Sequence, residues 1–155
     1  MNIDHIPIKR IQDNSESDGK SQFGEWPHMC AILNEVNIAG LKHNLYTCGG
    51  SLIAPNVILT AAHCFNTIDG NATQIVARCG EWDTQDEIEL EKHQDVRAKE
   101  IKFHPGFVKG SPNLHNDFAI VILEDEFILD KHIDTICLPN EFERHVAHHA
   151  QLKCK

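Results

Sequence analysis

The sequence has 155 residues, 41% of them hydrophobic, and a formal net charge of −9 from 14 Lys and Arg against 23 Asp and Glu. This length and apolar fraction suffice for one domain with a hydrophobic core and exclude wholesale disorder. The acidic balance argues against nucleic acid as a partner, since phosphates are bound by clustered Lys and Arg. The longest apolar runs are too short to span a membrane. Six cysteines indicate an oxidising, secreted setting.

Residues 1–20 are expected to form a flexible approach segment or linker. They are charged and polar, and Ile11–Ser21 is rich in Asp, Asn, Ser and Gly, which favours irregular structure. The segment also lacks the apolar core of a signal peptide. Because the cysteines indicate an extracellular protein, we expect its natural start to lie upstream.

Short apolar runs alternate with turn signals from Phe23 onward. Such regular short strands, without long helical periods, predict an all-β barrel or sandwich. A single helical turn is expected at Ala61–Cys64, and residues 141–155 lose the strand pattern. The predicted strands are Met29–Leu33, Leu52–Ala54, Val57–Thr60, Ile75–Cys79, Val96–Phe103 and Phe118–Leu123.

Two neighbouring motifs carry the strongest functional signal. Cys48–Ile53 (CGGSLI) and Leu59–Cys64 (LTAAHC) together resemble the segment of trypsin-like serine proteases that holds the general-base histidine. His63 matches that base, and Asp117 in the motif NDFAI resembles the family's orienting Asp, with Phe118 in a usually aliphatic position. In this family the His accepts the proton of the serine nucleophile, while the Asp fixes the imidazole tautomer. Taken alone, His63 would be a solvated loop histidine and Asp117 a turn residue.

The sequence contains no serine in the nucleophile context of this family, Gly-Asp-Ser-Gly-Gly. Ser51 follows two glycines, but it opens the strand before His63 and has a structural interpretation. The chain by itself is therefore not expected to carry out acyl transfer through a serine. Every serine precedes Asp117, namely Ser15, Ser17, Ser21, Ser51 and Ser111.

The resemblance extends from Phe23 to Pro139 and implies the N-terminal antiparallel β-barrel of a two-barrel trypsin-like fold, with the second barrel largely absent. Residues 21–155 would then form a partial protease domain, with the first barrel ending near residue 140 and the inter-barrel segment following. Gly80–Gln85 (GEWDTQ) and His132–Pro139 (HIDTICLP) resemble the arthropod clip-domain serine proteases and their inactive, masquerade-like homologues.

The resemblance implies a serine-type endopeptidase of an extracellular cascade, with protein substrates or other cascade proteins as partners. The alternative is a catalytically inactive homologue that acts as a binding cofactor or regulator in a melanisation-type cascade. Gly80–Gln85 favours this alternative, as does Arg10–Asp13 (RIQD), which departs from the Ile-Val-Gly-Gly activation sequence. A third hypothesis is a half-barrel binding module, which would expose a large apolar patch.

The resemblance also implies disulfides. One would close the loop around His63, and the other would cross the barrel. Two further cysteines are left over, and their connectivity stays open. The implied pairs are Cys48–Cys64 and Cys30–Cys79, and the remaining cysteines are Cys137 and Cys154.

No cofactor is required by the family, but Glu81–Glu91 lies where relatives often have a calcium loop. Calcium prefers several carboxylate and carbonyl oxygens, and this segment holds six carboxylates. By motif position, Glu81, Asp83 and Glu91 are the predicted ligands, and the alternative is a solvated acidic turn. Asn71 opens the sequon Asn-Ala-Thr and is a candidate glycosylation site in a secreted protein.

Overall fold

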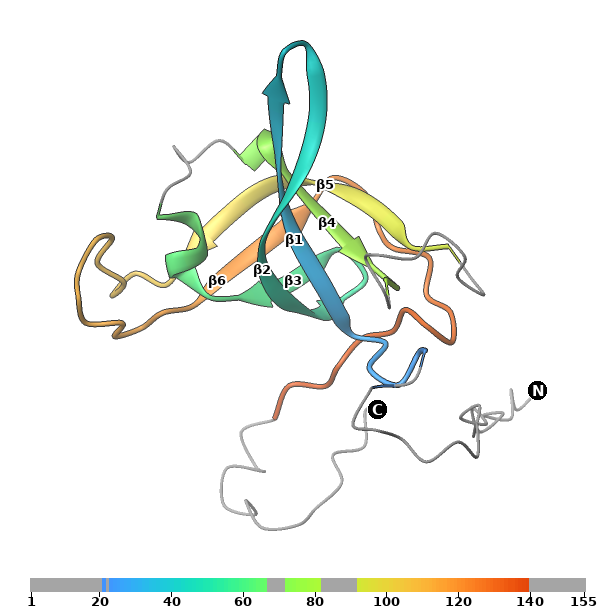
Figure 1. Ribbon diagram of the computed structural model, residues 1–155. Coiled ribbons are helices and arrows are strands. Elements are labelled where there is room, and N and C mark those ends of the chain that lie inside the picture. The colour runs from blue at the N-terminus through green and yellow to red at the C-terminus, as the bar shows by residue number, and fades with distance from the viewer. Residues whose placement is uncertain (1–20, 22, 67–71, 82–91, 140–155) are drawn as a thin grey trace.

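The computed structural model describes residue 21 and residues 23–66, 72–81 and 92–139. These residues form a closed barrel of six antiparallel strands in the order β1-β2-β3-β6-β5-β4 (Figure 1), which confirms the expected all-β barrel. No α-helix occurs within these ranges, and the regular elements include two 3-10 helices, η1 and η2. The elements are β1 (Met29–Ile38), β2 (Leu41–Ala54), β3 (Val57–Thr60), η1 (Ala62–Phe65), η2 (Ala72–Gln74), β4 (Ile75–Cys79), β5 (Gln94–Phe103) and β6 (Ala119–Leu123).

The barrel forms because its strands alternate between residues that face the interior and residues that face outward. In β6, Ala119, Val121 and Leu123 are buried while Ile120 between them is exposed. β3 alternates in the same way, β4 is buried along most of its length, and one apolar cluster fills the interior of the barrel. Phe118, which was expected in this strand, lies just before it and is exposed.

The first hairpin extends well past the barrel and forms a projecting two-stranded arm (Figure 1). The prediction ended the first strand at Leu33 and began the second at Leu52, so it missed this arm. β1 pairs with β4 only as far as Asn34, and beyond that residue it pairs with β2 alone. Ala39 and Gly40 form the turn with φ of 54° and 86°, and positive φ at both turn residues is typical of a type I′ hairpin turn.

Ion pairs fasten the base of this arm to the barrel. The Glu35 carboxylate accepts hydrogen bonds from Arg97 on β5 at 3.1 Å and from Lys42 on β2 at 3.0 Å. Arg97 also donates to the Thr73 carbonyl at 2.6 Å. Arg97 thereby links Glu35 of the arm to β5 and to η2.

Several predictions fall on segments outside the residues that the structure describes. The approach segment 1–20 lies outside the described residues, as does the candidate glycosylation site Asn71. Within the described residues no helix is long and apolar enough to cross a membrane.

Gly80, directly after β4, occupies a position that only glycine fits. Its φ is +81°, and an added Cβ would lie 2.7 Å from His132 Cδ2 and 2.8 Å from Ile133 Cγ1. Both neighbours are buried, so they have little room to move aside. Gly40 in the arm has a similar φ of +86°, but an added Cβ there would meet nothing within 4 Å.

We expect Gly80→Ala to lower the free energy of unfolding by about 2–5 kcal/mol, because backbone strain and overpacking act together. Gly40→Ala should cost only about 1 kcal/mol, because backbone strain acts alone. Urea denaturation of both variants measures the difference, and equal losses would contradict the steric argument.

Candidate functional site

The pairing of β3 with β6 brings the two predicted site residues together. Thr60, the last residue of β3, is the register partner of Ala119, the first residue of β6. His63 follows Thr60 by three residues, and Asp117 precedes Ala119 by two. Two residues that lie 54 positions apart in the chain are therefore placed side by side at one end of the barrel.

His63 lies on η1, and two contacts, one on η1 and one at the end of β3, tie this segment to β2. The expected helical turn is present as a 3-10 helix, displaced by one residue. The disulfide Cys48–Cys64 joins this helix to β2. The Thr60 hydroxyl, just before the helix, donates to the Gly49 carbonyl at 2.8 Å. The backbone of His63 is thus fixed on both sides.

Asp117 lies on the loop between β5 and β6. The backbone turns at Asn116, the residue before it. Asn116 has a φ of +58°, a left-handed conformation that Asn tolerates better than most residues. The backbone amide of Phe118 donates to the Asn116 carbonyl at 2.8 Å. The side-chain amide of Asn116 donates to the Gly106 carbonyl at 3.2 Å. A Cβ at Gly106 would lie 2.7 Å from Asn116 Nδ2, so glycine permits this approach.

The two side chains make a close, two-point contact. His63 Nδ1 lies 2.6 Å from Asp117 Oδ2, and the backbone amide of His63 donates to Asp117 Oδ1 at 2.8 Å. These hydrogen bonds, the imidazole bond foremost, hold the pKa of Asp117 below its ordinary value although desolvation opposes them. A carboxylate that accepts from Nδ1 keeps the proton on that nitrogen and leaves Nε2 as the basic atom.

The imidazole is open to solvent while its partner is more enclosed. The His63 side chain is 46% exposed and that of Asp117 is 16% exposed. A base that must reach a reacting group needs this accessibility, and an orienting carboxylate does not. Phe118 and Leu114, in the same loop as Asp117, are also exposed.

The structure contains both disulfides that the resemblance implied, Cys30–Cys79 and Cys48–Cys64. Cys30 and Cys79 are register partners of β1 and β4. Cys137 is disulfide-bonded as well, and Cys154 lies outside the described residues.

One cluster of metal-ligand types occurs among the described residues, and it does not form a metal site. Cys48, His63 and Cys64 have their ligand atoms within 4.8 Å of one another. The two sulfurs are joined in a disulfide, however, and zinc and related metals bind cysteine as the thiolate.

Of the three predicted calcium ligands, the structure describes only Glu81. Asp83 and Glu91 lie outside the described residues, so the calcium site stays a prediction. The Glu81 carboxylate forms ion pairs with Arg78 and His93, two residues that the sequence analysis did not single out.

Comparisons with known proteins bear on this site. The family model for trypsin matches residues 18–152. The chain is 40% identical over 134 residues to phenoloxidase-activating factor 2 of Galleria mellonella, covering 83% of this chain and 42% of that protein. It is 36% identical over 125 residues to the inactive CLIP domain-containing serine protease A8 of Anopheles gambiae, covering 80% and 33%.

A further relative is phenoloxidase-activating enzyme 1 of Spodoptera litura, which is 34% identical over 150 residues, covering 87% of this chain and 39% of that protein. The chain thus spans less than half the length of these relatives. Their names confirm the resemblance to clip-domain proteases and their inactive homologues.

We expect the pKa of Asp117 to rise toward its ordinary value in His63→Ala, because the largest contribution that lowers it is the bond to His63. The pKa of Asp117 is lower in the folded chain than in the unfolded chain. The ionised carboxylate therefore stabilises the fold fully at a pH above the unfolded pKa, and this stabilisation is lost as the pH falls through the folded pKa. Carbon-13 NMR titration of the Asp117 carboxyl measures the shift. His115→Ala, which removes an exposed histidine of the same loop, is the matched control. An unchanged titration in His63→Ala would contradict the assignment.

Proposed function

The chain belongs to the trypsin family, and we propose that it forms the part of a serine endopeptidase domain that holds the general base His63 and the orienting residue Asp117. The observation that carries this proposal is the 2.6 Å contact between Nδ1 and Oδ2, made by residues whose motifs match the family. Relatives named phenoloxidase-activating factor and phenoloxidase-activating enzyme support a role in a proteolytic cascade.

In this proposal the two residues perform one proton transfer together. Asp117 accepts a hydrogen bond from Nδ1 and thereby selects the tautomer in which Nε2 carries the lone pair. Nε2 then accepts the proton of a serine hydroxyl as that oxygen attacks a peptide carbonyl, and it later returns the proton to the leaving amine. The carboxylate beside Nδ1 stabilises the imidazolium that exists between these two steps.

The nucleophile is the component that this sequence does not supply. Its five serines all precede Asp117, and none has the family's nucleophile context. We propose that polypeptide outside these 155 residues contributes the serine, the oxyanion hole and the specificity pocket. The relatives are more than twice as long as the matched region, which supports this view.

The proposed setting is extracellular, and the proposed partners are proteins. Two described disulfides and a third bonded cysteine support an oxidising compartment. We propose that the substrates are other proteins of a secreted cascade, consistent with the names of the relatives.

A second candidate function is that of a non-catalytic homologue that acts by binding. Relatives at 36% and 34% identity are named as inactive proteases, and RIQD at Arg10–Asp13 departs from the usual activation sequence. A retained His–Asp pair is compatible with either function, because the missing component is the nucleophile.

A serine-directed fluorophosphonate probe distinguishes the two functions when it is applied to the complete protein encoded by the transcript. We expect covalent labelling of an endopeptidase, before or after limited tryptic cleavage, because the probe reacts with an activated serine. His63→Ala should slow labelling by about 10⁶-fold and Asp117→Asn by about 10⁴-fold, while His115→Ala should label like the natural protein.

Absence of labelling in the natural protein, both before and after cleavage, would contradict the endopeptidase proposal and favour the binding homologue. Thermal unfolding of each variant controls for loss of the fold. A variant that labels poorly but melts at the natural midpoint has lost reactivity alone.

A further inference from the structure

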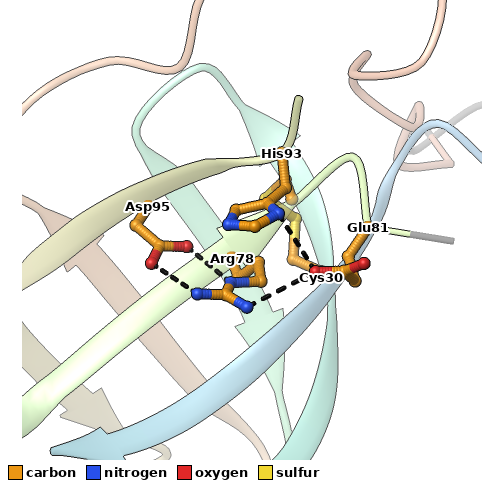
Figure 2. A network of polar contacts seen from close by, with 6 residues as sticks. Cys30, Arg78, Glu81, His93 and Asp95 are labelled. Carbon is orange, nitrogen blue, oxygen red and sulfur yellow. Dashed lines mark hydrogen bonds and ion pairs between the residues drawn. A yellow bond between two sulfur atoms is a disulfide. The ribbon is translucent and has the colours of Figure 1, made fainter. Parts of the chain in front are cut away.

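A chain of ion pairs connects the end of β4 to the start of β5, the two strands that flank residues 82–91 (Figure 2). Arg78 and Asp95 are register partners, and the guanidinium donates to both carboxylate oxygens, from Nε and from Nη2, at 2.8 Å each. Arg78 Nη1 also lies 3.4 Å from Glu81 Oε2, and His93 Nδ1 lies 3.1 Å from the same oxygen. The guanidinium is therefore placed between carboxylates from both ends of the loop.

The positive charge at this position is permanent and well fixed. A two-pronged Arg–carboxylate pair holds the guanidinium plane in one orientation. The side-chain hydrogen bond with Asp95 raises the pKa of Arg78 above its ordinary value, although partial burial opposes this effect. The Arg78 side chain is only 25% exposed and that of Glu81 only 12%, so water screens the pair less than it would a pair on the open surface.

The backbone around Glu81 is fixed as well. Cys79, two residues earlier, is bonded to Cys30 on β1, and this disulfide lies beside the ion pairs in Figure 2. Gly80 holds its left-handed conformation against buried His132 and Ile133. Because both preceding residues are held in place, the backbone of Glu81 stays close to Arg78.

We infer that Arg78 takes the place of a calcium ion in this chain and that its ion pairs, without a metal, join the end of β4 to the start of β5. Calcium binds where six to eight oxygens converge on it, with carboxylates supplying most of the negative charge. Glu81 Oε2 already contacts a guanidinium and an imidazole, and a divalent cation on this carboxylate would lie close to the fixed charge of Arg78. The described part of the predicted calcium site therefore does not suit the metal.

Thermal unfolding of the 155-residue chain in EDTA, in millimolar calcium and in millimolar magnesium tests the inference. We expect the unfolding midpoint of the natural sequence to be the same in all three, or to shift equally in the two salts. Arg78→Gln should lower the midpoint by about 3 °C or more, in calcium as in EDTA. Lys102→Gln, which removes an exposed cation 3.6 Å from Glu100, is the matched control and should leave the midpoint unchanged.

A rise of the midpoint in calcium but not in magnesium would overturn the inference, and so would an Arg78→Gln variant that melts with the natural midpoint. If Arg78→Gln does not fold, isothermal titration of calcium into the natural sequence decides the question. No binding at millimolar calcium is the expected result, and saturable one-to-one binding would overturn the inference.

Discussion

The pairing of β3 with β6 is the constraint on which the rest of this structure depends. It closes the barrel, because β3 ends the run of strands that begins with β1, and β6 leads back through β5 to β4. It also determines the site, since the end of β3 and the start of β6 meet at one register pair, Thr60 and Ala119. His63 and Asp117 are therefore brought together by backbone hydrogen bonds, and their side chains need only complete the contact.

The strands with buried faces could be predicted from the sequence, and the projecting arm could not. β3, β4 and β6 carry apolar residues at every second position or in continuous runs, which burial requires. The arm residues Glu35–Tyr46 are mostly exposed, so no buried face imposes such a pattern. Pairing between the two strands and the turn at Ala39 and Gly40 hold the arm, and that turn lacks the Asn-Gly or Asp-Gly signature.

The sequence predicted the His63–Asp117 pair but not the ion-pair network around Arg78. The identities of His63 and Asp117 follow from motifs that run along the chain, because each residue is fixed by its immediate neighbours. The network of Arg78, Glu81 and Asp95 depends on register across two strands, with a separation of 17 residues between the Arg and its partner. The resemblance and the carboxylates of Glu81–Glu91 predicted a calcium site, whereas the guanidinium beside Glu81 is seen only in the fold.

The central claim is that the barrel presents His63 with its Nδ1 proton directed at Asp117 and Nε2 as the basic atom. Nitrogen-15 NMR of the imidazole ring tests this claim most directly, since the two tautomers have distinct ring-nitrogen shifts. We expect one tautomer, protonated at Nδ1, in the natural sequence and a mixture of tautomers in Asp117→Ala. The same mixture in both proteins would contradict it.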